Sequence, residues 1–436
     1  MITLLIIADD FTGALDTGVQ FAAYGARTHV VTDISYDFSC ADPDIQVLVM
    51  DTRTRHLPAD AAEKIVYGLT KRAISRGIPY IYKKTDSALR GCVGSELSAV
   101  LRASGINSLP FLPSLPKMKR CVRDGFLYID GCPVKDSVFG RDPLNPVTSS
   151  YIPELIQQQS TVHVSIHSLK KPEGIPSFFP EIAVWDAETD SELLQLGKLL
   201  QSQGRLSVTA GCAGFGSILA QLLQLSGNPV SAPTFRPGLL VICGSVNPIT
   251  LQQLEDAEQK GFPRISLSPE QLADPGFWDT PAGFSHLEQW MYFFKQNRRL
   301  ILDTNGPVRA EAARQNALQM YAKAHGLSQE ELQKRIPDAC GRILKGLAAQ
   351  GIDGTFMVIG GDTLAGCMRQ LGVCELEPQC ELEPGTVLSS FRLDQKPCQI
   401  ISKSGGFGSR ELLSTLAHQI LVQPPAGQNH TSSNTF

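Results

Sequence analysis

The sequence alternates short apolar runs with longer segments that have the periodicity of amphipathic helices. Apolar runs cover 3–7, 46–50 and 80–82, and helical patterns follow the second and third runs at 59–75 and 93–102. Short strands separated by helices are typical of βα units, whose strands lie parallel in one sheet. The sequence therefore predicts an α/β fold in which each domain is a mainly parallel sheet flanked by helices.

The alternation is interrupted at 226–238, where three prolines, two glycines and two serines replace any regular period. Such a composition is typical of a linker between domains. A new apolar run at 239–243 restarts the alternation, and a chain of 436 residues is long enough for two domains. We expect an N-terminal domain at 1–230, a C-terminal domain at 238–422 and a disordered polar tail at 423–436.

Overall charge and the cysteine pattern limit the partners and the compartment. The formal net charge of −4 disfavours nucleic acid as the main partner. None of the eleven cysteines belongs to a Cys-x-x-Cys pair, so we expect reduced thiols. The apolar start at 1–8 meets Asp9 and Asp10 at once, too soon for a signal peptide or a membrane span. We expect a cytoplasmic protein that binds neither nucleic acid nor membrane. The basic cluster at 117–123 fits a solvated loop or an anion site.

Some local patterns predict structure rather than chemistry. The pair Asp130–Gly131 inside the apolar segment 126–134 predicts a hairpin. The glycine run at 210–216 predicts close packing of a helix on a strand. Asp190 follows an acidic loop and is expected to cap a helix.

The loop after the first apolar run contains a pair of carboxylates. In open α/β sheets, ligands bind beyond the carboxyl ends of the strands. Asp9 and Asp10 stand at this position, with Thr12 and Gly13 at the start of the next helix. Two carboxylates there are costly unless they are solvated, paired or bound to a metal. Asp10 is a candidate base or orienting group, and the alternative is that Asp10 or Thr12 caps the helix.

Two further loops of the first half follow apolar runs and are rich in charge. Arg53 and Arg55 follow the second run, where an arginine fork suits a carboxylate ligand and a surface salt bridge is the alternative. The third loop mixes cations, a carboxylate and hydroxyls, which suits a polyhydroxy acid. Its polar residues are Lys83, Lys84, Thr85, Asp86, Ser87 and Arg90.

Three turns of the second half share one design: an apolar strand, a loop rich in glycine and hydroxyls, then a helix. They cover 243–250, 360–363 and 402–408. Glycine lets backbone N–H groups approach phosphate oxygens, although tight βα turns also use glycine routinely. Hydroxyls of Ser245 and Thr363 would add hydrogen bonds to a phosphate, and Lys403 or Asp362 would meet the phosphates or their magnesium. The P-loop, dinucleotide and protein-kinase signatures are all absent from the sequence.

Taken in order, these loops resemble the four-carbon acid sugar kinases. Ala-Asp-Asp-Phe-Thr-Gly-Ala-Leu-Asp at 8–16 is similar to the opening signature of that family, and Lys-Thr-Asp-Ser-Ala-Leu-Arg-Gly at 84–91 to its second. The runs 360–363 and 403–408 resemble its nucleotide signatures, with Asp362 where glutamate is common and Gly406 where asparagine is usual. The resemblance extends from residue 2 to residue 422.

The resemblance implies a kinase that uses ATP and Mg²⁺ to phosphorylate the terminal hydroxyl of threonate, erythronate or 3-oxo-tetronate. It implies an N-terminal sugar-acid domain, a C-terminal ATP domain and an active site in the cleft between them. Within that site we expect Asp10 to be the catalytic residue, which orients or deprotonates the terminal hydroxyl. Position by position, it implies sugar-acid contacts at Asp10, Arg53, Lys84, Thr85, Asp86 and Ser87. It implies ATP contacts at Ser245, Gly360, Gly361, Asp362, Thr363 and Gly405.

Two other functions remain open at this point. A non-catalytic sensor of sugar acid and nucleotide would have the same loops but release no ADP. A Rossmann-like oxidoreductase is disfavoured by the missing glycine fingerprint. The sequence leaves the acid, the metal ligands and the oligomeric state open, with a homodimer as one expectation.

Overall fold

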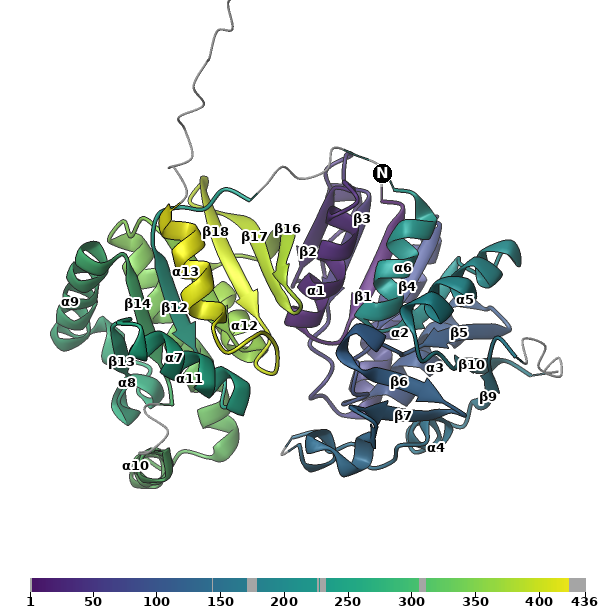
Figure 1. Ribbon diagram of the computed structural model, residues 1–436, viewed down its shortest axis with the longest axis horizontal. Helices are drawn as coiled ribbons and strands as arrows, with labels where there is room; N and C mark the ends of the chain where they lie inside the picture. The colour runs from purple at the N-terminus through teal and green to yellow at the C-terminus, as the bar shows by residue number, and fades with distance from the viewer. Residues whose placement is uncertain are drawn as a thin grey trace, which may run out of the picture. The chain divides into compact units, whose positions relative to one another are not determined.

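The computed structural model describes residues 2–142, 144–170, 179–225, 227, 233–305 and 311–422, with side chains undescribed at 311–315. The chain divides into two compact units, Met1–Val230 and Ser231–Phe436, and each is α/β (Figure 1). The expected linker at 226–238 lies only partly among the described residues. The expected tail at 423–436 lies outside them.

The first unit is built on a parallel sheet in the order β2–β3–β1–β4–β11–β5–β10–β9. Every residue of β1 is buried, as expected where helices cover both faces of a sheet. The register pairs Ala8 with both Asp51 and Lys84, so the loops after β1, β3 and β4 begin side by side. The strands are β1 (Leu4–Ala8), β2 (Thr28–Val31), β3 (Val47–Asp51), β4 (Tyr80–Lys84), β5 (Ser108–Leu112), β9 (His163–His167), β10 (Glu181–Trp185) and β11 (Val208–Gly211).

Helices cover both faces of this sheet because alternate strand residues point to opposite sides. Leu5 and Ile7 of β1 belong to one core with Val66 and Val100 from the helices of one face. On the other face, Gly18 lies so close to β3 that a Cβ would stand 3.2 Å from Val49. The helices are α1 (Phe11–Ala22), α2 (Ala59–Ser75), α3 (Val93–Ser104), α4 (Ile152–Gln157), α5 (Asp190–Ser202) and α6 (Ala213–Leu223).

A small antiparallel sheet accompanies the first unit, with strands β6 (Arg120–Arg123), β7 (Phe126–Ile129) and β8 (Cys132–Pro133). Asp130 and Gly131 join β7 to β8, which confirms the predicted hairpin. Both residues have a positive φ, 50° and 78°, as a type I′ turn requires.

The second unit has a sheet in the order β13–β14–β12–β15–β18–β17–β16, parallel up to β18 and antiparallel beyond it. Ile359 pairs with both Cys243 and Lys403, so the loops after β12, β15 and β18 begin side by side. The strands are β12 (Leu239–Cys243), β13 (Arg264–Ser266), β14 (Arg299–Asp303), β15 (Thr355–Ile359), β16 (Glu375–Glu383), β17 (Thr386–Leu393) and β18 (Lys396–Lys403).

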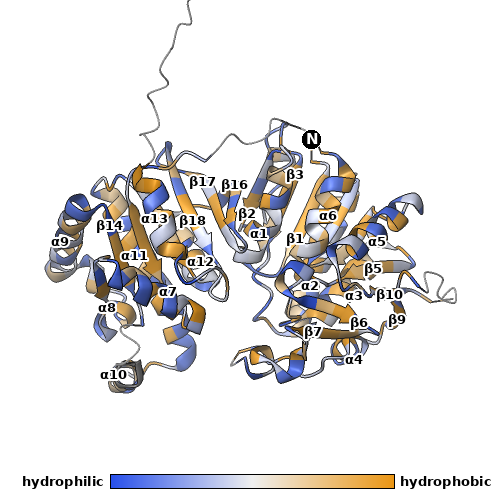
Figure 2. Ribbon diagram, in the orientation of Figure 1, coloured by the Kyte–Doolittle hydropathy of each residue, from blue (hydrophilic) through white to orange (hydrophobic). Residues whose placement is uncertain are grey.

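Helices also pack on both faces of the second sheet, whose inner strands are apolar, as β14 shows in Figure 2. On one face Leu254 and Leu416 share a core with Val241 and Met357. On the other, Phe294 covers Gly238, where a Cβ would stand 2.8 Å from its ring. The helices are α7 (Pro248–Gln259), α8 (Pro269–Ala273), α9 (Pro281–Asn297), α10 (Glu311–Ala324), α11 (Gln329–Ala349), α12 (Gly361–Leu371) and α13 (Leu412–Val422).

Some expectations need correction or addition. Thr189, not Asp190, caps α5, because its hydroxyl accepts from Glu192 N and Glu192 returns the bond as a capping box. The glycine run at 210–216 does serve packing, since a Cβ on Gly214 would stand 2.2 Å from Ser114 O. No helix in the described part of the chain has the length and apolarity to cross a membrane.

Candidate active site

The loop after β1 forms the first wall of the candidate sugar-acid site. Asp10 is the N-cap of α1 and accepts hydrogen bonds from Gly13 N at 3.2 Å and from Thr12 Oγ1 at 2.7 Å. The capping alternative is therefore correct for Asp10. Capping occupies some of its lone pairs and fixes the carboxylate at the carboxyl edge of the sheet.

Arg55, in the loop after β3, binds both aspartates of the first loop. Its Nε lies 2.7 Å from Asp9 Oδ2 and its Nη2 lies 2.6 Å from Asp10 Oδ1. The same Nη2 lies 3.7 Å from Asp86 Oδ1, in the loop after β4. Arg55 is buried, so its charge-assisted hydrogen bonds to Asp9 and Asp10 and its ion pair with Asp86 are shielded from water and join three loops.

Lys84, the last residue of β4, adds a second cation to the cluster. Its Nζ lies 3.6 Å from Asp9 Oδ1 and 3.5 Å from Asp10 Oδ1. Burial alone would raise the pKa of Asp10, but Arg55 and Lys84 outweigh it and hold that pKa well below its usual value. Asp10 is consequently ionised at neutral pH, which makes it a good hydrogen-bond acceptor and a weak base.

Arg53 does not join this cluster. Its side chain is 48% exposed, and its Nη2 donates to Thr32 O at 3.1 Å. Its φ of 50° is left-handed, a costly conformation for a residue other than glycine. Its N–H donates to Asp51 Oδ1 at 3.1 Å, and burial raises the pKa of the Asp51 carboxyl to about 7. The structure thus brings Arg55, rather than Arg53, onto the aspartates, and leaves Arg53 partly open to solvent.

The loop after β4 holds the other predicted sugar-acid residues. Thr85 is buried, and its N–H and hydroxyl donate to Gly211 O at 2.8 and 3.2 Å. Asp86 accepts from Arg90 Nε at 2.8 Å and from Arg90 Nη2 at 3.1 Å. Burial would raise the pKa of Asp86, but Arg90 and Arg55 together hold it well below its usual value. Ser87 Oγ accepts a hydrogen bond from Arg120 of β6.

A buried ion pair lies beneath these loops. Lys83 Nζ stands 3.1 Å from Glu96 Oε2 of α3, and Thr54 donates to the other oxygen of Glu96. Both charged side chains are fully enclosed, where a charge is stable only if it is paired. The pair ties β4 and the loop after β3 to α3, behind Arg55 and Lys84.

Several members of this cluster are not among the sugar-acid contacts predicted from the sequence. For Asp9 and Arg55 the sequence did contain a signal. Two adjacent carboxylates after a buried strand require cations, and Arg55 was as good a candidate as Arg53. Arg120 belongs to the basic cluster at 117–123, for which a solvated loop and an anion site were both open, and the structure brings it to Ser87. The residues of the cluster outside the predicted contacts are Asp9, Arg55, Lys83, Arg90, Glu96 and Arg120.

In the second unit, the three glycine turns meet where β12, β15 and β18 end. A Cβ on Gly244 would stand 2.0 Å from Thr363 Oγ1, and one on Gly405 would stand 2.3 Å from Ser245 Oγ. Gly360 has a φ of 112°, which only glycine adopts readily, and a Cβ there would lie 3.7 Å from Ser245 N. The predicted residues Ser245, Gly360, Thr363 and Gly405 therefore lie together at one sheet edge.

Gly361 and Asp362 form the first turn of α12, immediately after Gly360. Backbone N–H groups in the first turn of a helix have no partner within the helix and favour an anion. Asp362 is exposed, so its carboxylate is accessible to solvent. Within the described part of the chain, no three histidine, cysteine or acidic side chains gather as metal ligands would.

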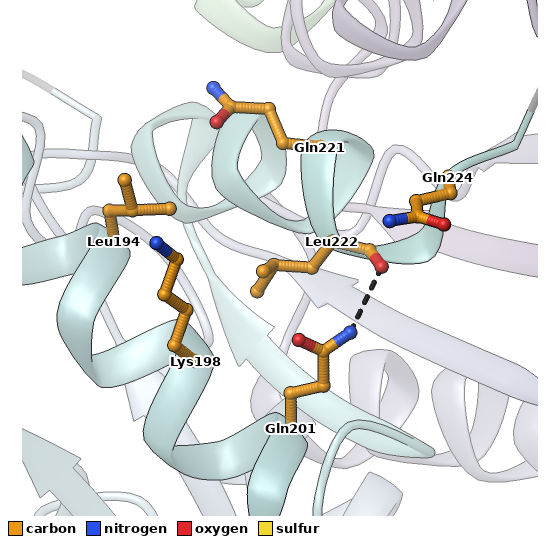
Figure 3. A pocket seen from close by; sticks show the side chains of 6 residues that line it. All are labelled: Leu194, Lys198, Gln201, Gln221, Leu222 and Gln224. Carbon is orange, nitrogen blue, oxygen red and sulfur yellow. Dashed lines mark hydrogen bonds between the residues drawn. The ribbon is translucent and has the colours of Figure 1, made fainter.

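A hollow of about 290 Å³ between α5 and α6 contains none of the predicted site residues (Figure 3). It is lined by Lys198 and Gln201 on α5 and by Gln221 and Leu222 on α6, among others. Gln201 Nε2 donates to Leu222 O at 3.1 Å across it. Its single cation and its lack of a carboxylate distinguish it from the charged strand ends, and no function is assigned to it.

Two family models match the chain, one in each unit. The model described as sugar-binding N-terminal domain matches residues 4–219, and the model described as nucleotide-binding C-terminal domain matches residues 240–413. The first match contains the charged loops after β1, β3 and β4. The second contains the three glycine turns and every residue that was predicted to contact ATP.

Relatives of known activity match nearly end to end. A D-threonate kinase from Salmonella typhimurium is 28% identical, over 96% of this chain and 98% of its own. A 3-oxo-tetronate kinase from Pseudomonas fluorescens is 25% identical, over 95% and 96%. A D-erythronate kinase from Heliobacterium modesticaldum is 24% identical, over 97% and 98%.

Solved structures show the same fold. A Salmonella typhimurium protein has a TM-score of 0.77 at 20% identity, and a Haemophilus influenzae protein of the DUF1537 family has 0.69 at 19%. Each alignment covers 96% of this chain and 100% of the other. With matched sugar-binding and nucleotide-binding domains and kinases as full-length relatives, the chain belongs to the four-carbon acid sugar kinase family and is a phosphotransferase that acts on an alcohol group.

Proposed function

We propose that this protein transfers the γ-phosphoryl group of ATP to the terminal hydroxyl of threonate, erythronate or 3-oxo-tetronate. The observation that carries the proposal is the cluster of Asp10, Arg55, Lys84 and Asp86 at the carboxyl ends of adjacent parallel strands. Fixed cations and carboxylates at one sheet edge supply both donors and acceptors, as a polyhydroxy acid requires.

The acid end of the substrate is assigned to Arg53. Arg55 is already engaged by two aspartates, whereas Arg53 is half exposed and stands at the same strand end. A guanidinium group can bind a carboxylate through two parallel hydrogen bonds. Lys84 and the polar groups at Thr85, Asp86 and Ser87 are then assigned to the remaining oxygens of the substrate.

We assign to Asp10 the binding and orientation of the reacting hydroxyl. Phosphoryl transfer proceeds through a loose transition state, so positioning contributes more than strong proton abstraction. The low pKa of Asp10 fits this role: burial opposes ionisation, but Arg55 and Lys84 keep the carboxylate charged. Asp10 accepts the hydrogen bond of the hydroxyl and directs its lone pair at the γ-phosphorus. As the new P–O bond forms, the bond from the γ-phosphorus to the oxygen of the leaving ADP breaks, and the hydroxyl proton passes through Asp10 to solvent.

We assign nucleotide binding to the three glycine turns of the second unit. Gly244, Gly360 and Gly405 let the three turns pack closely at one sheet edge, where the hydroxyls of Ser245 and Thr363 can donate to phosphate oxygens. The backbone N–H groups in the first turn of α12 add further donors for an anion. Mg²⁺ would neutralise charge on the phosphates. It binds through one or two carboxylates, water and phosphate oxygens, so the accessible carboxylate of Asp362 fits it without a larger cluster.

Compartment and assembly are part of the same proposal. All eleven cysteines are without disulfide partners, which supports a location in the reducing environment of the cytoplasm.

A homodimer is retained as a proposal, and light scattering of the purified protein across a concentration series tests it. A constant monomer mass would remove it.

A coupled assay for ADP tests the reaction itself. Purified protein with ATP and Mg²⁺ is assayed against D- and L-threonate, D- and L-erythronate and the 3-oxo-tetronates, with tartrate as a control that lacks a terminal hydroxyl. We expect ADP release with at least one tetronate and none with tartrate. Nucleotide and acid binding without turnover on any member would favour the sensor alternative.

A further inference from the structure

Lys403 is a buried cation inside one of the glycine turns. It ends β18, it is fully enclosed, and its Nζ lies 3.0 Å from Ser404 O, 3.4 Å from Gly405 O and 3.5 Å from Thr250 Oγ1. Thr250 Oγ1 in turn donates to Gly405 O at 2.7 Å. A protonated lysine has three N–H donors, and three oxygens surround this one. A direct bond from Lys403 to a phosphate would require one of these contacts to be given up.

The two carbonyl contacts fix the orientation of the peptide groups that follow them. A trans peptide is planar, and its N–H points opposite to its C=O. Because Ser404 O and Gly405 O point toward Lys403, the N–H groups of Gly405 and Gly406 point away from it. Neither N–H takes part in a hydrogen bond within the described part of the chain. Adjacent N–H groups that point the same way form an anion-binding concavity.

We propose that Lys403 is a positioning residue for the nucleotide: its ammonium group holds the turn so that the N–H groups of Gly405 and Gly406 face a phosphate. This inference rests on the nucleotide site proposed above and assigns a role within it. Lys403 acts through the backbone and does not touch the phosphate. Thr250 supports it by holding the Gly405 carbonyl from α7.

The protonation of Lys403 makes the arrangement sensitive to pH. Burial lowers the pKa of Lys403 to about 8, against the opposing influence of Cys243 on β12 and Glu383 on β16, the titratable groups that face it. Burial raises the pKa of the Cys243 thiol, so that group stays neutral in this range. Below pH 8 the lysine is charged and holds both carbonyls. Above pH 8 it loses its charge, and we expect the KM for ATP to rise.

Lys403→Met tests the role, because methionine keeps the length of the side chain and removes the charge. We expect the KM for ATP and the Kd for ADP to rise about tenfold or more, the loss typical of a charge-assisted hydrogen bond, with the KM for the sugar acid unchanged. Lys396→Met on the exposed start of the same strand is the control and should change neither constant. An unchanged KM for ATP in Lys403→Met overturns the proposal.

Two further arms keep the test decisive. If Lys403→Met does not fold, Thr250→Val removes one tether of the Gly405 carbonyl and should raise the KM for ATP in the same direction by a smaller factor; no rise overturns the proposal. In the wild type, the KM for ATP should increase between pH 7 and pH 9, and the increase should vanish in the methionine variant. If the KM for ATP still increases with pH in that variant, Lys403 is not the group responsible for the pH dependence.

Calorimetric titration with ADP separates failure of this inference from failure of the proposed function. A wild-type protein that binds no ADP contradicts the nucleotide site itself. Equal ADP affinity in the wild type and in folded Lys403→Met contradicts the role of Lys403 alone and leaves the site in place.

Discussion

Gly13 and Lys84 lie so close that no side chain fits between them: a Cβ on Gly13 would stand 1.9 Å from Lys84 Nζ and 2.4 Å from Asp10 Oδ1. The two residues are far apart in the sequence and belong to α1 and β4. The absence of a side chain at position 13 therefore has a steric reason. It leaves room for the ammonium group of Lys84 to reach the carboxylates after β1.

Gly13→Ala should impair the sugar-acid site selectively. The new methyl group must displace Lys84, and a misplacement of about 1 Å at a reacting centre can cost about a hundredfold in rate. We expect kcat/KM for the sugar acid to fall by about tenfold to a hundredfold while ADP affinity is unchanged. Steady-state kinetics and ADP titration check both.

Gly68→Ala is the matched control for that substitution. Gly68 lies in α2 with no atom within 4 Å of an added Cβ. Alanine there should leave activity unchanged and raise the free energy of unfolding by about 0.5–1 kcal/mol. Full activity of Gly13→Ala would contradict the close approach to Lys84.

Arg53→Met and Arg55→Met should separate substrate binding from site architecture. Arg53 is half exposed, so its loss should raise the KM for the sugar acid about tenfold or more with little change in stability. Loss of Arg55 leaves the buried Asp9 and the half-buried Asp10 without their main cation, and should cost about 3–5 kcal/mol of stability. Thermal unfolding and kinetics measure the two effects. The reverse pattern would transfer the acid-binding role to Arg55.

Asp10→Asn should reduce kcat far more than it weakens substrate binding. Asparagine keeps the shape but loses the charge that holds the hydroxyl and balances Arg55 and Lys84. We expect kcat to fall about a hundredfold or more, with sugar-acid affinity changed much less. Asp44→Asn, at an exposed position, is the control. Unchanged turnover in the Asp10 variant would remove Asp10 from the reaction.

Asp51→Asn should alter how stability depends on pH. Burial, assisted by the charge of Asp10, raises the pKa of Asp51 from 3.8 to about 7. Between these values the folded state keeps a proton that the unfolded state has released, so this carboxyl stabilises the fold at low pH and loses that effect as pH rises through 7. The contribution is at most about 4 kcal/mol. Asparagine does not titrate, so the variant should gain in thermal midpoint relative to the wild type from pH 5 to pH 8. A constant difference would place the pKa of Asp51 near its ordinary value.

Gly405→Ala should weaken nucleotide binding through Ser245. The added Cβ would stand 2.3 Å from Ser245 Oγ, so the two turns must separate. We expect ADP affinity to fall about tenfold, with the sugar-acid KM unchanged. In the double variant with Ser245→Ala, which removes the colliding hydroxyl, the combined loss should be smaller than the sum of the single losses. Additive losses would show that the contact with Ser245 is not responsible.

Local patterns in the sequence predicted the elements well where periodicity was strong. The helix expected at 59–75 has those bounds, as α2. The strand expected at 239–243 is also found, as β12. The antiparallel pair β16 and β17 was missed because β16 contains four glutamates in nine residues and has no continuous apolar run. A partly solvated strand lacks the pattern by which a buried strand is recognised.

The family and its two charged signatures at 8–16 and 84–91 could likewise be predicted from the sequence. The role of each residue in the charged loops could not. The expectation that the reaction takes place between the domains stays a prediction. Arg53 and Arg55 are equivalent by spacing and chemistry, and their difference in exposure comes from contacts with loops elsewhere in the chain. Lys403 was expected to address phosphate, and the structure turns its ammonium group toward carbonyls of its own turn.

The sequence by itself determined where strands, helices and glycine turns would form, because apolar period, capping residues and backbone freedom act over a few neighbouring residues. Only the tertiary structure decided which charges would meet. The order of β3, β1 and β4 sets Arg55, Asp10 and Lys84 side by side, and strand order depends on long-range pairing that no short stretch of sequence records.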